Sequence, residues 1–122
     1  FLAWGSLGQG VLSGKYDVTA RFDREDRRHR DVYTNFHGAK FGAIQALIPQ
    51  LRACAADAGI ASLTQLALRW VIERFPRALP LVGIKRPEQI IDAAGALHIK
   101  LDPDHMNRLD KLTQEFKGPL SV

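Results

Sequence analysis

The chain has 122 residues, 46% of them hydrophobic and 25% charged, with a formal net charge of +4. These values are typical of one soluble globular domain. No apolar run approaches the roughly 20 residues of a membrane span, and the single Cys54 excludes an internal disulfide and a cysteine-based zinc cluster. We therefore expect a cytoplasmic protein without a membrane partner.

The first predicted element is a short buried strand over Phe1–Trp4. Gly5, Gly8, Gly10 and Gly14 follow it and break any regular pattern. Glycine tolerates backbone angles that other residues avoid, so this spacing predicts a loop that approaches another group closely.

Residues 17–38 are polar and charged and predict one long loop, either flexible or covering a cofactor. Five arginines lie between Arg21 and Arg30, but Asp23, Glu25 and Asp26 alternate with them. Mixed charge of this kind favours a solvated loop over a nucleic-acid-binding arm.

Two helices are predicted next. Apolar residues recur at helical spacing over residues 40–58, where Pro49 predicts a kink or a helix start and Gly59 a stop. Ser62 and Gln65 have the spacing of a capping box for a second helix that ends near Arg74. Its predicted inward face comprises Leu63, Leu66, Ala67, Trp70 and Val71.

The remaining elements are a strand and two more helices. Residues 79–83 predict a buried strand, with Pro80 among its first residues. Pro87 and Asp102–Pro103 are typical helix starts, and Gly118–Pro119 ends the last helix. Its predicted inward residues are Met106, Leu109, Leu112 and Phe116.

The predicted order is strand, long loop, helix, helix, strand, helix, helix. If the two strands pair directly, the long connection between them favours a parallel pair. Two parallel strands leave open edges and too little sheet to cover. The pattern is therefore that of the end of a larger α/β structure.

Each predicted strand is followed by a loop that contains basic residues. The first loop is "GSLGQGVLSGKY" and the second is "GIKRPEQ", in which Gly83 permits a tight turn. Lys15, Lys85 and Arg86 supply positive charge, and the helix from Pro87 directs its positive dipole end to the same place. Surface lysines before helices are common, but two such loops favour phosphate binding.

Four segments together resemble the aldo-keto reductase family. Residues 4–16 resemble its pattern S-P-L-A-x-G-x-L-T-G-K-Y after an aromatic residue. Residues 62–70, "SLTQLALRW", resemble T-P-A-Q-x-A-L-x-W. Residues 80–97, "PLVGIKRPEQIIDAAGAL", and residues 101–110 resemble the two family motifs that follow. The resemblance implies an eight-stranded (β/α) barrel of the TIM type, of which this chain is the C-terminal part over residues 1–122.

The resemblance also implies an NADP-dependent oxidoreductase that reduces aldehydes and ketones. Trp4 would lie against the nicotinamide. Gly5, Leu7, Gln9 and Gly10 would line the pyrophosphate.

Basic residues would hold the phosphates of this cofactor. Lys15 and Arg21 would lie over the pyrophosphate as part of a closing loop, and Lys85 with Arg86 would meet the adenosine 2′-phosphate, in the turn that Gly83 permits.

At the adenosine end, Gln89 would contact the adenosine and Asp92 the adenine amine. The chain departs from the family pattern at Gly5 and Ser6, where the family has Ser-Pro, and at Ala93, where it has an adenine-binding Asn. Loss of that amide removes a hydrogen bond worth about 1 kcal/mol, so cofactor binding is expected to be weaker.

The family's catalytic tyrosine, lysine, aspartate and histidine have no matching motif here, so no catalytic residue is assigned. Tyr16 and Tyr33 are interpreted as packing or loop residues, and the four histidines show no metal-ligand spacing. The expected partners are NADP(H), a small carbonyl substrate and the missing N-terminal part of the barrel, and no nucleic acid.

Two alternatives stay open at this point. The first is a non-enzymatic basic helical module that binds nucleic acid or an acidic partner, although its second helix is mostly apolar. The second is a structural part of an assembly, completed by the missing barrel half.

Overall fold

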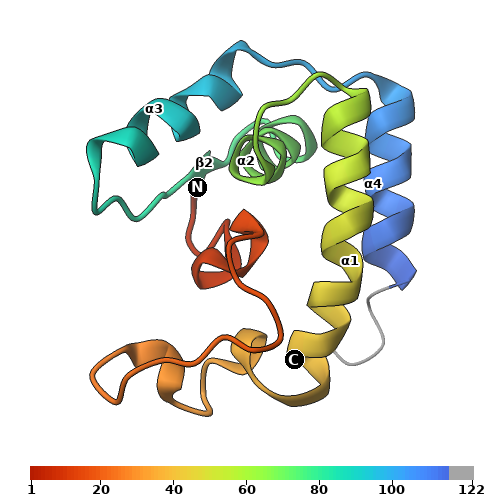
Figure 1. Ribbon diagram of the computed structural model, residues 1–122. Helices are drawn as coiled ribbons and strands as arrows, with labels where there is room; N and C mark the ends of the chain where they lie inside the picture. The colour runs from red at the N-terminus through yellow and green to blue at the C-terminus, as the bar shows by residue number, and fades with distance from the viewer. Residues whose placement is uncertain (116–122) are drawn as a thin grey trace.

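The computed structural model describes residues 1–115, so the predictions for Phe116 and Gly118–Pro119 lie outside the described residues. The elements are β1 (Leu2–Ala3), α1 (Gly38–Asp57), α2 (Leu63–Arg74), β2 (Leu79–Pro80), α3 (Pro87–Gly95) and α4 (Pro103–Glu115). A short two-stranded sheet lies near α2 and α3, while α1 and α4 lie side by side farther from it (Figure 1). Short 3₁₀ turns occupy Gly8–Ser13, Arg27–His29, Thr34–Phe36 and Ala96–His98.

The two strands pair in parallel, as the sequence predicts, with Leu2 opposite Leu79 and Ala3 opposite Pro80. The backbone N–H of Leu79 donates to the carbonyl of Phe1 at 2.8 Å, and that of Leu81 donates to Ala3 at 3.0 Å. Pro80 lies between these two donors, so its missing N–H costs no ladder bond. The loops after β1 and β2 therefore leave the same edge of the sheet.

The prediction that both strands are buried is wrong. Each ordered strand has only 2 residues, Leu79 is 66% exposed and Trp4, just beyond β1, is 80% exposed. A two-stranded sheet has too little area to cover its own faces, and within residues 1–115 no further strand pairs with it. Several apolar side chains of these two segments therefore remain exposed in the described chain.

Helix α1 forms one side of the core and runs unbroken through Pro49, so the predicted helix start at this residue is wrong. Pro49 is exposed, and the carbonyl that its missing N–H leaves without a partner can bind water on that side. The buried residues of α1 recur at helical spacing and are Phe41, Ile44, Leu47, Ile48, Leu51, Cys54 and Ala55.

A tight connection joins α1 to α2. Gly59 adopts φ 68°, as predicted for a helix stop, and the N–H of Ile60 donates to the carbonyl of Ala55 at 2.8 Å. This is the Schellman arrangement, which satisfies the last carbonyls of α1. Ser62 then caps α2 by accepting the N–H of Gln65 at 3.1 Å, as the sequence predicts.

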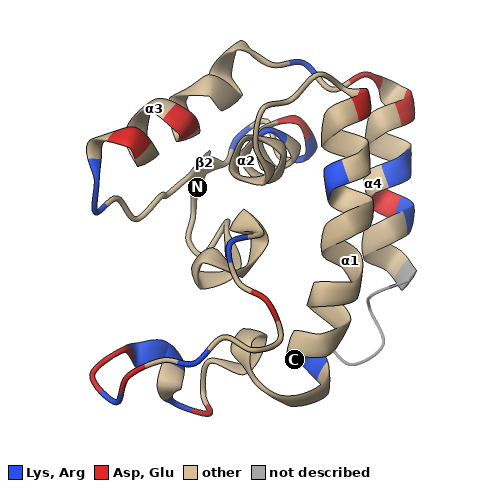
Figure 2. Cartoon of the chain, in the orientation of Figure 1, with Lys and Arg blue, Asp and Glu red and all other residues tan. Residues whose placement is uncertain are grey.

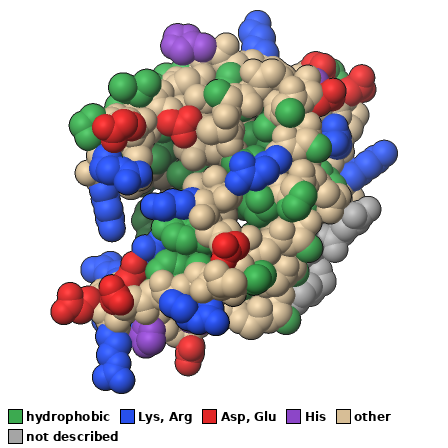
Figure 3. Space-filling view, viewed as in Figure 1, with side chains coloured by type: hydrophobic (Ala, Val, Ile, Leu, Met, Phe, Trp, Pro, Cys, Tyr) green, Lys and Arg blue, Asp and Glu red, His purple; other side chains and the backbone are tan. Residues whose placement is uncertain are grey.

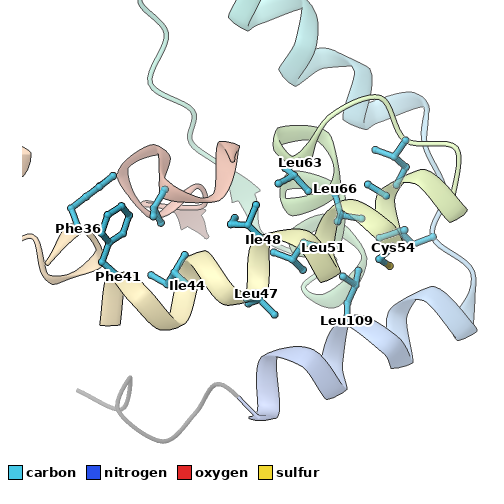
Figure 4. Close-up of a cluster of buried hydrophobic side chains, with 14 residues drawn as sticks. Phe36, Phe41, Ile44, Leu47, Ile48, Leu51, Cys54, Leu63, Leu66 and Leu109 are labelled. Carbon is cyan, nitrogen blue, oxygen red and sulfur yellow. The ribbon is translucent and has the colours of Figure 1, made fainter. Parts of the chain in front are cut away.

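The core lies where α1, α2 and α4 meet (Figure 4). Leu63 and Leu66 of α2 pack with Leu51 of α1 and Leu109 of α4. Leu68 is also buried although the predicted inward face omits it, because α2 contacts β2 and α3 as well as the main core. Among the described helices, none is long and apolar enough to cross a membrane.

Two glycine substitutions are expected to have opposite effects on stability. Gly59→Ala forces a Cβ into the left-handed region and lowers the free energy of unfolding by about 1 kcal/mol. Gly42→Ala is the control, since Gly42 lies inside α1 with open space around its Cβ position. It is expected to raise stability by about 0.5–1 kcal/mol. Urea unfolding of both variants measures the two changes in stability. A stabilising Gly59→Ala would contradict the role of Gly59 as a left-handed helix stop.

Candidate functional site

The segment after β1 is a glycine-rich turn over residues 5–14. Positive φ angles occur at Gly5, Gly8, Gly10 and Gly14, as the glycine spacing predicts, and also at Gln9 with φ 55°. Left-handed geometry costs a non-glycine residue about 1 kcal/mol or more. The side-chain oxygen of Gln9 accepts a hydrogen bond from Asn35 at 2.8 Å, which holds this strained residue against the long loop.

Close contacts anchor the end of this turn on the helical core. Val11 is only 1% exposed, and Arg52 of α1 donates to the carbonyl of Gly14 at 2.7 Å. A Cβ on Gly14 would lie 2.7 Å from the Arg52 guanidinium and 2.8 Å from Leu63, so a larger residue would displace these side chains, and the φ of 70° also favours glycine. The turn is therefore fixed at its far end.

The near end of the turn offers backbone donors. Within residues 1–115 no hydrogen-bond acceptor is found for the backbone N–H groups of residues 4–7. Ser6 instead directs its hydroxyl back to the carbonyl of Ala3 at 2.8 Å. Consecutive N–H groups without internal acceptors are typical of anion-binding turns.

The second turn, residues 81–86, is held by Gln89 of α3. Its side-chain oxygen accepts the backbone N–H of Lys85 at 2.7 Å and that of Arg86 at 3.0 Å. The side chains of Lys85 and Arg86 are exposed, and both residues directly precede the first turn of α3. Two cations thus lie at the positive end of a helix dipole.

Asp92 attaches α3 to α2. One carboxylate oxygen of Asp92 accepts the hydroxyl of Ser62 at 2.7 Å and the amide of Gln65 at 3.1 Å. Gly95 lies so close to Gln65 that a Cβ there would be 2.4 Å from its amide nitrogen. The Gln65 side chain therefore binds α3 rather than completing the predicted capping box.

The 17–38 segment is organised by Arg28, whose role the sequence does not reveal. The Arg28 guanidinium lies 4.4 Å from the ring centroid of Phe22, 5.0 Å from Tyr16 and 5.7 Å from Phe36. It also donates to the Tyr16 hydroxyl and pairs with Asp26. Stacking and bidentate pairing together suit arginine and not lysine. Tyr16 is a packing residue, as predicted.

Asp26 links the two halves of the site electrostatically. Its pKa is lowered to about 2, chiefly by the hydrogen bond from Arg28 and in small part by the positive charge of Lys85. Lys15 lies 5.7 Å from the centroid of the Tyr16 ring that Arg28 also faces. Lys15 thus lies beside the aromatic cluster around Arg28, and the charge of Lys85 acts on the Asp26 carboxylate.

The surface is hollowed between α3 and the 17–38 segment (Figure 3). Lys and Arg side chains lie on both rims of this hollow, and acidic residues alternate with the basic ones in the lower segment (Figures 2 and 3). Basic side chains therefore lie on both sides of one hollow, which suits an extended anionic ligand.

Arg21 is placed differently from the other predicted basic residues. Its guanidinium donates to the carbonyl of Ala20 at 2.9 Å and lines a cavity of about 480 Å³ beside the start of α1. The cavity is also lined by Val18, Phe22, His29, Phe36, His37, Phe41 and neighbouring small residues. Within the described residues, no group of three His, Cys, Asp or Glu side chains has metal-binding geometry.

The comparisons with known proteins identify the family. The family model described as aldo/keto reductase matches residues 1–114, so the chain belongs to the aldo/keto reductase family. An aldo-keto reductase of Strobilurus tenacellus is 26% identical over 97% of the chain and 34% of its own length. An aryl-alcohol dehydrogenase [NADP(+)] of Phanerodontia chrysosporium is 31% identical over 56% of the chain and 18% of its own length.

The fold agrees with this assignment. The structure of a glycerol dehydrogenase from Gluconobacter oxydans has a TM-score of 0.83 at 25% identity, covering 99% of this chain and 36% of that one. The predicted partial (β/α) barrel is therefore confirmed, with two parallel strands and their helices. The chain spans about a third of the length of the Strobilurus reductase and of the Gluconobacter glycerol dehydrogenase.

The Asp26–Arg28 pair makes stability depend on pH in the acid range. Because the pKa of Asp26 is lower in the folded protein, the pair stabilises the fold above about pH 4, and this contribution is lost as the pH falls towards 2. Asp26→Asn is expected to lower the unfolding free energy by about 1 kcal/mol at pH 7 and less at pH 2.5.

The control for that measurement is Asp23→Asn, an exposed position three residues earlier. Urea unfolding at the two pH values compares both variants with the wild type. An equal loss from Asp26→Asn at both pH values would show that the carboxylate charge is not what stabilises the segment.

Proposed function

We propose that the chain is the C-terminal, cofactor-binding part of an NADP-dependent aldo-keto reductase that reduces aldehydes and ketones. The observation that carries the proposal is the pair of turns, one glycine-rich and one basic, that leave one edge of a parallel strand pair. In α/β folds this edge is where ligands bind. The cofactor, when bound, supplies the hydride for carbonyl reduction.

The roles we propose follow from the groups that each turn offers. The N–H groups near Gly5 and Leu7 would bind the pyrophosphate, and the side chain of Lys15 would lie over it. Gln9 and Gly10, which both have positive φ angles, would maintain the backbone conformation that lines the pyrophosphate. Trp4, which is 80% exposed, would present its ring to the nicotinamide.

The basic turn would select the phosphate on the adenosine ribose. Lys85 and Arg86 are exposed cations at a helix N-terminus, which favours a 2′-phosphate and therefore NADP(H) over NAD(H). At Gly83 no atom lies within 4 Å of the Cβ position and φ is not positive, so the turn as folded does not require glycine there. Arg21 would reach the pyrophosphate only if its bonds to the Val18 and Ala20 carbonyls break.

We further propose that these 122 residues lack reductase activity by themselves. No tyrosine, lysine, aspartate and histidine set with the family's spacing is found in the sequence. Exposed apolar side chains on and beside β1 and β2, including Phe1, Leu2 and Leu79, support a missing N-terminal barrel part as the partner of this sheet. A small carbonyl compound is the proposed substrate of the complete enzyme, and the proposed location is the cytoplasm.

Lys85→Met tests the cofactor preference. We expect the variant to bind NADPH about fivefold to tenfold more weakly, because one exposed charge-assisted contact is lost, with less than about a twofold effect on NADH. Nicotinamide fluorescence measures both dissociation constants. Lys111→Met, an exposed lysine on α4, is the matched control. Equal weakening of NADPH and NADH would contradict a 2′-phosphate contact.

The two tryptophans allow a test of where the nicotinamide lies. Trp70 is half-buried on α2 and donates its indole N–H to Asp110 at 3.2 Å, whereas Trp4 is exposed at the proposed site. Added NADPH should quench tryptophan emission in Trp70→Phe and leave it largely unchanged in Trp4→Phe. The reverse pattern would place the cofactor elsewhere on the chain.

A further inference from the structure

The basic turn has few internal bonds, and one side chain supplies all of them. Within residues 1–115, every hydrogen bond made by the backbone of residues 82–86 joins it to Gln89. The side-chain oxygen of Gln89 accepts from Lys85 and Arg86, and the carbonyl of Arg86 accepts the N–H of Gln89 at 3.1 Å. The shape of this turn thus depends on one glutamine.

No other group near the turn can replace these bonds. Pro87 at the first helical position has no N–H, and the Arg86 side chain has no acceptor with which to cap α3. The side-chain nitrogen of Arg86 lies 4.0 Å from Glu88, an exposed pair of little strength. No atom lies within 4 Å of the Cβ position of Gly83, and the other residues of 83–86 are exposed.

The C-terminal half of α3, by contrast, is bound to α2 by several contacts. Asp92 accepts hydrogen bonds from Ser62 and Gln65 of α2, and Gly95 lies against Gln65. Gln89 stands one turn of α3 before Asp92 and therefore connects this half of α3 to the basic turn. A displacement of the turn would move both cations, because Gln89 binds the backbone N–H of each.

We infer that Gln89 is a positioning residue that holds the backbone of Lys85 and Arg86 and thereby sets the preference for a ligand that carries a ribose phosphate. This inference rests on the proposed function. The inference deepens that function, because Gln89 would act on the ligand by positioning Lys85 and Arg86 and not by the direct contact with adenosine that the sequence predicts. Its side-chain oxygen is already engaged by two backbone donors.

The test compares Gln89→Ala and Gln89→Glu with the wild type. Adenosine 2′,5′-bisphosphate and 5′-AMP serve as probes, because they differ in the ribose phosphate alone. Calorimetry gives their dissociation constants, and NMR hydrogen exchange reports the protection of the Lys85 and Arg86 amides. Gln50→Ala, an exposed glutamine on α1, is the matched control.

Gln89→Ala should expose both amides to exchange and weaken the bisphosphate about fivefold to tenfold, while 5′-AMP changes less than about twofold. Gln89→Glu keeps an acceptor oxygen, so both amides should stay protected. Its added negative charge beside Lys85 should still weaken the bisphosphate, and this effect should shrink as salt is raised.

Three outcomes would count against the inference or the function separately. If Gln89→Ala leaves the ratio of the two dissociation constants unchanged, the positioning role is wrong. If Gln89→Ala reduces the preference for the bisphosphate over 5′-AMP while both amides keep their protection, Gln89 touches the ligand directly and the inference is overturned. If the wild type binds the bisphosphate no better than 5′-AMP, the proposed NADP preference fails, while the exchange data still decide whether Gln89 holds the turn.

Discussion

The site depends on the parallel pairing of two very short strands. Two backbone bonds, from Leu79 to Phe1 and from Leu81 to Ala3, join segments that lie more than seventy residues apart in the sequence. An antiparallel pair would send the glycine-rich turn and the basic turn to opposite edges. Because the pair is parallel, both turns leave the strands at the same end of the sheet, and the basic turn leads directly into the positive end of α3.

The helices hold this arrangement more firmly than the strands do. Helix α2 contacts the core of α1 and α4 on one side and α3 on another, and its N-cap Ser62 serves both the helix and Asp92. Gly14 is fixed against Arg52 and Leu63, which ties the glycine-rich turn to the same core. Both turns are therefore positioned by helix packing, whereas the strands themselves remain exposed.

Local signals predicted much of the fold. The stop at Gly59, the cap at Ser62 and the starts at Pro87 and Pro103 each depend on a few neighbouring residues, so the sequence alone shows them. The continuation of α1 through Pro49 could not be predicted locally, since tertiary packing of the α1 face outweighs the loss of one backbone hydrogen bond. The strands were expected to be buried because their composition reflects a larger sheet than the described chain contains.

The two turns of the candidate site could be predicted from the sequence, but the contacts within them could not. Glycine spacing and cations after apolar segments indicate phosphate binding. The Arg28 cluster requires three aromatic rings and Asp26 to converge within a segment that has no periodic pattern, and no spacing rule predicts that. Asp92 and Gln89 show the same limit, since their partners on α2 and on the backbone appear only once α3 has docked.

The net charge of +4 is consequently a poor guide to what the chain binds. Several arginines are compensated within the fold: Arg28 pairs with Asp26, Arg69 with Glu73 and Arg74 with Asp110. A nucleic-acid surface needs uncompensated cations spread along a helix or strip. Here Lys15 lies 5.7 Å from the centroid of the Tyr16 ring, and the charge of Lys85 acts on the Asp26 carboxylate that Arg28 already pairs with. Such charge is local and partly neutralised, which suits the few phosphates of a dinucleotide better than a polyanion.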